Sequence, residues 1–179
     1  MEDLHFNDST LHSRKLLETF FVQSLEELYF AENTIAASFD GIKDQINSEK
    51  LDTILGNHVA IHHKHKKRLE KIFELRNETI AAKPSESIIA LLSEAKKYFT
   101  IFSNDIVNWE IALILISQKL AHYKIAAYGA VAHLAINLND HRAATLLAIG
   151  VQEEEEYIEK HLNGITHEFL KPYADNFNG

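Results

Sequence analysis

Apolar residues recur every three or four positions over most of the chain, the pattern of helices that each bury one face. The first stripe predicts a helix over residues 10–46 and consists of Leu17, Phe21, Leu25, Leu28, Ile35, Phe39 and Ile42. Asn47 and Ser48 follow it and offer side chains that can cap the next helix. A second stripe, from Leu51 to Phe73, predicts a helix that ends near Arg76.

A polar segment, residues 77–84, separates this first pair of helices from the rest of the chain. Ser85 can cap a shorter apolar helix that ends near Phe102. The next long helix begins near Asp105, and apolar residues occupy most of its circumference. More than one of its faces must therefore be covered, either inside a bundle or in an oligomer.

A turn with capping residues at positions 139–142 precedes the last long helix, which is predicted to run to about Phe169. Pro172 has no amide proton and is expected to stop that helix. Two helical hairpins joined by a connection of about thirty residues are typical of a ferritin-like topology. The pattern thus predicts an all-α, up-down four-helix bundle with a long crossover that carries the short extra helix.

The composition agrees with a single globular unit. The chain has 179 residues, of which 46% are hydrophobic, and it contains only 6 Gly and 2 Pro, so few positions interrupt a helix. We expect one domain over residues 1–179, with terminal tails at 1–9 and 172–179.

Charge and cysteine content narrow the possible partners. The absence of Cys means that any metal must be held by carboxylates and imidazoles. A net charge of -8 argues against a nucleic-acid partner. No basic segment followed by an apolar core opens the chain, and no apolar run approaches the length of a membrane span, so we expect a cytoplasmic protein without a membrane partner. No phosphate loop or nucleophile motif identifies a small-molecule substrate.

Ionisable residues interrupt the apolar stripes. Glu32 fills the missing step of the first stripe, and His58, His62 and His65 fill the gap of the second, whereas His63 points to another side and is expected to face solvent.

The other two long helices contain one such interruption each. Glu154 lies at the centre of the last stripe, within the charged run EEEE, and Lys124 lies on the apolar line of the third long helix. Glu32, His62 and His65 lie about as many residues from the turn near Ser48 as Lys124 and Glu154 lie from the turn near Asn139. All five positions are therefore expected at one level in the middle of the bundle. A lone inward Glu or His is more often a hydrogen-bonded core residue than a ligand. The prediction of a functional site therefore rests on the level that these residues share.

Four segments resemble the YciE/YciF-type family of ferritin-like, stress-associated bacterial proteins. They are LEELYFAE at residues 25–32, the pattern H58…H65..RLE..FE, QKLAHYKIAAYG at residues 118–129, and the EEE segment of the last helix. The resemblance covers about Leu16 to Leu162. It implies a ferritin-like bundle, often dimeric, that in some members carries a two-metal carboxylate centre, and a biochemical activity that is poorly defined.

A ferritin-like dinuclear centre uses a Glu from each of two helices and Glu-x-x-His from each of the other two. Glu32, His65 and Glu154 match this pattern, but His62 replaces a Glu and Tyr157 stands at a His position. The resemblance also implies a carboxylate at position 124, where this chain has Lys.

The Lys124 ammonium could bridge Glu32 and Glu154 and repel a metal, so we expect a degenerate centre, replaced by a Glu-His-Lys polar network, without a cofactor. One alternative is an iron- or zinc-binding oxidase or peroxide-handling protein with Glu32, His62, His65 and Glu154 as metal ligands. Another is a homodimeric interaction module. The sequence leaves open whether the protein is an enzyme.

Overall fold

The structure is a computed structural model that describes residues 2–175, with side chains described for residues 12–172. These residues form helices without strands. The elements are α1 (Glu2–Asp40), η1 (Lys43–Gln45), α2 (Glu49–Leu75), α3 (Glu86–Ile101), α4 (Ile106–Asn137), α5 (His141–Tyr157), η2 (Ile158–Leu162) and α6 (Asn163–Asp175). None of the described helices combines the length and apolar character needed to cross a membrane.

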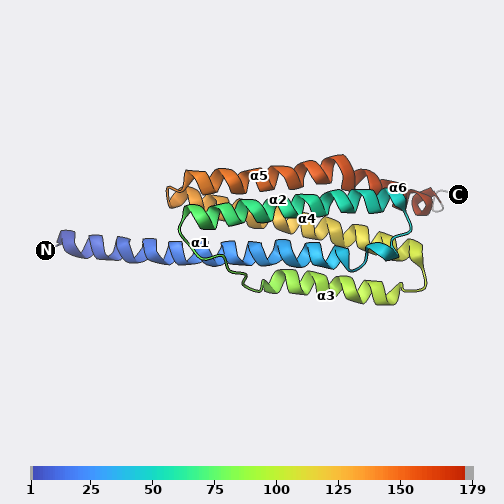
Figure 1. The fold of residues 1–179 in the computed structure, drawn as a ribbon, viewed down its shortest axis with the longest axis horizontal. Helices are drawn as coiled ribbons and strands as arrows, with labels where there is room; N and C mark the ends of the chain where they lie inside the picture. Colours follow the sequence, from blue (N-terminus) through green and yellow to red (C-terminus); the bar gives the residue numbers. More distant parts are fainter. Residues whose placement is uncertain (1, 176–179) are drawn as a thin grey trace.

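Four long rods form the bundle, as Figure 1 shows. Helix α1 packs antiparallel to α2, α4 packs antiparallel to the rod made of α5, η2 and α6, and the two hairpins meet through α1 with α4 and α2 with α5. Helix α3 lies outside the bundle against α4 and α1, within the crossover between the hairpins. The predicted all-α, ferritin-like up-down bundle with a helix in its crossover is confirmed.

Side-chain caps form at the start of three helices. Ser48 and Asp140, from the predicted capping segments, and Asp105 each accept a hydrogen bond of 3.0–3.2 Å from the backbone N–H three residues later. Ser85 precedes α3, but its hydroxyl makes no capping bond and instead lies 3.2 Å from the Tyr123 hydroxyl. Ser85 thus links the crossover helix to α4.

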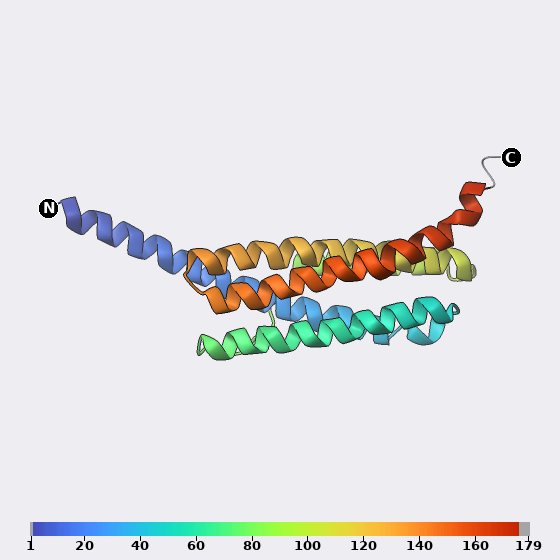
Figure 2. The same cartoon turned by 90° about the horizontal axis from the view of Figure 1, so that it is seen from above.

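The N-terminal segment 1–9 was expected to be a tail, but α1 begins at Glu2. Figures 1 and 2 show this first part of α1 projecting beyond the ends of the other helices. No Gly or Pro occurs before Gly41, so nothing in the sequence stops helix propagation toward the N-terminus. At its other end α1 stops at Asp40, before the predicted residue 46, because the chain tightens there into η1.

The C-terminal rod also differs from the prediction. It is continuous to Asp175 with Pro172 inside α6, so Pro172 does not end the helix and the predicted tail is helical as far as Asp175. Proline holds φ near the helical value, so Pro172 can continue the helix at the cost of the one backbone hydrogen bond that its missing N–H would have donated. The π-helical turn η2 interrupts the rod and places Ile158 and Leu162 in the core. Residues 176–179 lie outside the described residues.

The apolar core is divided into two clusters by the ionisable residues. On α1, Leu28 belongs to one cluster and Ile35 to the other, with Glu32 between them. On α4, Tyr128 and Leu120 belong to opposite clusters on either side of Lys124. The bundle therefore contains a polar layer near mid-height with apolar packing above and below it.

Candidate functional site

The centre of the polar layer is the Lys124 ammonium, from α4. Its Nζ lies 2.5 Å from Glu154 Oε1, 3.0 Å from Glu32 Oε2, 3.0 Å from His62 Nδ1 and 3.1 Å from His65 Nδ1. All five side chains are fully or almost fully buried. Three other helices thus direct two carboxylates and two imidazoles onto one nitrogen.

Glu32 accepts most of its hydrogen bonds from residues far away in the sequence. Its Oε1 accepts a 2.7 Å bond from the Tyr128 hydroxyl, and its Oε2 lies 2.6 Å from His62 Nδ1. Tyr128 is one turn beyond Lys124 on the same face of α4, so both groups reach Glu32 together.

Space for the Tyr128 ring depends on a glycine in α5. A Cβ added to Gly150 would lie 2.9 Å from Tyr128 Cδ1 and 3.0 Å from Cε1, closer than real Cβ contacts. Gly150 therefore lets the Tyr128 ring pack directly on the α5 backbone.

Glu154 is held on its other side by His58. Its Oε2 lies 2.9 Å from His58 Nε2, and the His58 ring stacks on Tyr157 with ring centroids 3.9 Å apart and planes inclined by 16°. Tyr157 occupies the position where the dinuclear pattern has a histidine. Its ring packs against an imidazole, and its hydroxyl lies 3.4 Å from the Ile54 carbonyl oxygen.

The layer reaches the surface at Glu153. His65 Nε2 lies 2.9 Å from Glu153 Oε2, and Arg68 binds both oxygens of this carboxylate at 2.7 Å. The Glu153 side chain is 26% exposed, whereas that of His65 is fully buried. A series of hydrogen bonds from Lys124 through His65 to Glu153 therefore connects the buried ammonium to the partly solvated ion pair of Glu153 and Arg68.

The number of N–H donors on Lys124 constrains which ring nitrogens of the histidines carry protons. An ammonium has three N–H donors. If it donates to Glu32, Glu154 and His65 Nδ1, then His65 carries its proton on Nε2 and donates to Glu153. No ammonium proton remains for His62, so His62 Nδ1 donates to Glu32. This assignment gives every donor an acceptor.

Two acceptors remain without partners. His62 Nε2 and His58 Nδ1 are buried and make no hydrogen bond with any described residue. With His58 Nε2–H donating to Glu154, both of these atoms are unprotonated nitrogens of neutral rings. Burial of an unpaired imidazole nitrogen is less costly than burial of an unpaired charge, which favours the neutral state.

Electrostatics keeps the Glu32 and Glu154 carboxylates ionised and the His58 and His62 rings neutral. Burial acts to raise the pKa of Glu32, but the Lys124 ammonium and the hydrogen bond from His62 outweigh it and hold this pKa well below its ordinary value. Burial also acts to raise the pKa of Glu154, but the Lys124 ammonium and the hydrogen-bonded His58 outweigh it. The pKa of Glu154 therefore also lies below its ordinary value. Burial, reinforced by Lys124, lowers the pKa of His62 to about 3.

Tyr128 remains a hydrogen-bond donor under these conditions. Burial, together with the neighbouring Glu32 carboxylate, raises the pKa of its hydroxyl well above the ordinary value. The inner layer thus combines the Glu32 and Glu154 carboxylates and the Lys124 ammonium with the neutral rings of His58 and His62.

The predicted layer is present in the structure. Glu32, His62, His65, Lys124 and Glu154 meet around one point, His58 joins them, and His63 is exposed as expected. Two residues of the layer, Tyr128 and Glu153, were not predicted from the sequence. Tyr128 follows Lys124 by four residues on an apolar line and resembles an ordinary core aromatic. Glu153 lies within the charged run EEEE, and nothing in that run indicates that it contacts a buried histidine.

Comparison with known proteins places the chain in a family. Residues 16–174 match the family described as Domain of unknown function (DUF892). The chain is a member of the DUF892 family.

Relatives of this DUF892 member include Protein YciF of Escherichia coli K12. The two are 29% identical over 142 residues, which cover 79% of this chain and 85% of the relative. The crystal structure of the E. coli stress protein YciF matches with a TM-score of 0.79 and 26% identity, over 87% of this chain and 97% of that one. YcfI of Rhodopseudomonas palustris has the same fold, with a TM-score of 0.77, 24% identity, and coverage of 82% of this chain and 92% of that one.

Proposed function

We propose that this DUF892 member is a non-enzymatic, cytoplasmic, stress-associated bundle in which an ammonium has replaced a pair of metal ions. In this account the Glu-His-Lys network holds the four long helices in register and supplies no redox chemistry. The stress association follows that of E. coli YciF, which is described as a stress protein.

The observation that carries the proposal is the position of Lys124 Nζ. It lies within 2.5–3.1 Å of Glu32, Glu154, His62 and His65, the four residues that would otherwise serve as metal ligands. Their donor atoms therefore converge on a cation that belongs to the chain itself.

The donor set does not fit two close metal ions. The pattern for a dinuclear centre supplies four carboxylates and two imidazoles, whereas the inner layer offers two carboxylates. The described residues contain no group of three or more His, Asp or Glu side chains placed to hold a metal ion. An ion entering beside Lys124 would also face a positive charge at about 4 Å, a repulsion of several kcal/mol at an interior dielectric near 20.

The test is metal uptake and iron oxidation by the purified protein and its Lys124→Glu variant. We expect no stoichiometric oxidation of Fe(II) by oxygen in the unaltered protein, and two bound metal ions only in the variant. Lys64→Glu makes the same charge change at an exposed position of α2 and should behave as the unaltered protein. Two-iron oxidation by the unaltered protein would contradict the proposal.

A second candidate function is metal binding by Glu32, His62, His65 and Glu154 with oxidase or peroxide-handling activity. Two imidazole nitrogens and two carboxylate oxygens surround Lys124 Nζ at 2.5–3.1 Å, and zinc and iron accept such a donor set once the side chains have closed on the ion. Metal binding requires Lys124 to leave its position. One zinc or iron ion per chain, lost in both His62→Gln and His65→Gln, would support this alternative.

A homodimer is a further proposal and rests on α4. Its Ile106, Val107, Leu115 and Ile136 side chains are exposed, as a helix that is apolar around most of its circumference requires. Sedimentation equilibrium is expected to give twice the chain mass. A monomer at high concentration would count against it.

A further inference from the structure

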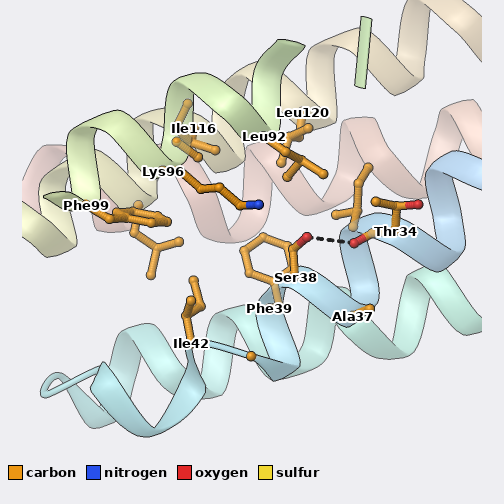
Figure 3. Close-up of a pocket in the computed structure, with 14 residues that line it drawn as sticks. Thr34, Ala37, Ser38, Phe39, Ile42, Leu92, Lys96, Phe99, Ile116 and Leu120 are labelled. Atoms are coloured by element: carbon orange, nitrogen blue, oxygen red, sulfur yellow. Dashed lines mark hydrogen bonds between the residues drawn. The ribbon is translucent and has the colours of Figure 1, made fainter. Parts of the chain in front are cut away.

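An apolar cavity of about 390 Å³ lies where the crossover helix covers the bundle, between α1, α3 and α4. Figure 3 shows its walls. The inner wall consists of buried apolar side chains, among them Ile35, Phe39, Leu113 and Leu120. The volume falls within the range of about 300–1,000 Å³ typical of small-molecule sites.

Small residues leave this space open. The cavity is lined by Ala37 on α1, by Gly41 just after α1 and by Ala95 on α3, and none of the three has a side chain large enough to fill the gap. Ser38 also lines the cavity, but its hydroxyl donates to the Thr34 carbonyl oxygen at 2.8 Å. The α1 wall therefore presents a surface that is mostly apolar.

Lys96 is the one charged residue among those that line the cavity. In Figure 3 its side chain runs from α3 into the space bounded by Phe39, Phe99 and Leu92. Within the described part of the chain no carboxylate pairs with this ammonium, whereas the neighbouring Lys119 pairs with Glu94. An anion at this position would gain a partner without breaking an existing one.

A second hollow begins where the cavity ends. It shares Ile42, Lys96 and Phe99 with the cavity and continues along polar residues that include Gln45, Ser103 and Asn104. An apolar chamber therefore passes, at Lys96, into a more open and polar space. An apolar cavity that adjoins a polar hollow is complementary to a molecule with an alkyl tail and a polar head group.

We propose that the cavity binds an amphipathic molecule with an unbranched alkyl chain and a single anionic head, such as a medium-chain carboxylate. The chain occupies the space between α1, α3 and α4, and the head pairs with Lys96 at the entrance to the polar hollow. The Phe39 ring, whose centroid lies 6.3 Å from those of His58 and His62, separates this site from the polar layer. The site is therefore independent of how the layer functions.

Isothermal titration calorimetry with hexanoate, octanoate and decanoate tests the proposal. Each added methylene should tighten binding about fourfold until the cavity is full, because each buries a similar apolar area. Ala37 lines the cavity from an exposed position of α1, so Ala37→Leu should narrow the cavity and weaken binding while leaving thermal unfolding near that of the unaltered protein. Absence of binding, affinity independent of chain length, or unchanged affinity in Ala37→Leu would overturn the proposal.

The head group is tested separately. Lys96→Gln should weaken decanoate about two- to fivefold, the range for a partly exposed ion pair, and leave decanol affinity unchanged. Lys97→Gln is the matched control, since Lys97 is exposed, as Lys96 is, but does not line the cavity. Equal losses in both lysine variants, or equal losses for decanol and decanoate, would show that no head-group site exists at Lys96.

The source of the alkyl chain is distinguished by vesicles. Decanoate binding without sedimentation on phosphatidylglycerol vesicles assigns a free carboxylate as ligand. Sedimentation on these vesicles that Ala37→Leu weakens assigns the acyl chain of an anionic lipid. Sedimentation that persists in Ala37→Leu, without decanoate binding, would contradict the cavity as the site.

Discussion

Lys124 Nζ on α4 lies 2.5 Å from Glu154 Oε1 on α5, and both side chains are completely buried. A buried pair of this kind is held by mutual neutralisation, because either charge alone would be very costly to remove from water. Glu32 completes the arrangement from the opposite side at 3.0 Å. The ammonium therefore joins two carboxylates that would otherwise repel each other.

Replacement of Lys124 by methionine should destabilise the fold by about 3–5 kcal/mol, because Glu32 and Glu154 would then be buried without their shared cation. Urea unfolding at pH 7.5 measures the change. Lys64→Met, at an exposed position of α2, should change the free energy of unfolding by less than about 0.5 kcal/mol. An unchanged midpoint in Lys124→Met would mean that the carboxylates are solvated.

Stability should fall in acid in two stages, and the first comes from the histidines. The pKa of His62 is about 3 in the folded state, lowered from 6.5 by burial, and that of His58 is lowered by burial as well. As the pH falls, the unfolded chain therefore binds protons at these histidines before the folded protein does. Their contribution to stability is complete above pH 6.5 and is lost as the pH falls below this value. Each such group contributes a slope of up to about 1.4 kcal/mol per pH unit.

The second stage comes from the carboxylates. Glu32 and Glu154 have lowered folded-state pKa values, so their contribution is complete above the unfolded value of 4.5 and is lost below it. Urea unfolding from pH 8 to pH 4 checks both stages. His62→Gln should reduce the slope between pH 6.5 and 4.5, whereas His63→Gln, at an exposed position, should leave it intact. Equal slopes in the two variants would contradict the neutral, buried state of His62.

Gly150→Ala should displace the Tyr128 ring and weaken its 2.7 Å bond to Glu32, because the new methyl group would lie 2.9 Å from Tyr128 Cδ1. We expect a loss of about 1–3 kcal/mol, the usual cost of overpacking. Gly56→Ala is the matched control, since its Cβ would meet no atom within 4 Å on an exposed face of α2, and it should stabilise the protein by up to about 1 kcal/mol. Thermal unfolding of the two variants should therefore shift in opposite directions.

Glu110→Ala should loosen the connection between α1 and α2. One carboxylate oxygen of Glu110 accepts hydrogen bonds from the backbone N–H groups of Asn47 and Ser48, at 2.8 and 2.7 Å. Their loss leaves two amides without acceptors and should cost about 1–3 kcal/mol. Hydrogen exchange at these two amides is the direct measurement, and protection equal to that of the unaltered protein would show that the turn does not depend on Glu110.

Periodicity alone was sufficient to predict the four long helices, the crossover helix and the level of the polar layer. Helix geometry makes this possible, because an inward position and its height follow from residue number. Packing of chain ends follows no such rule, and the helical segment before residue 10, the π-helical η2 and the continuation through Pro172 were all missed. Tyr128 was missed because an aromatic residue on an apolar line looks the same whether or not its hydroxyl has a buried partner.

The most direct test of the central claim is a crystal structure of the unaltered protein grown with excess Fe(II) or Zn(II), with anomalous diffraction recorded at the metal edge. We predict no anomalous peak between Glu32 and Glu154, and side-chain density for Lys124 that ends within hydrogen-bonding distance of both carboxylates. Two peaks between these carboxylates, with Lys124 turned away from them, would contradict the replacement of a metal pair by an ammonium.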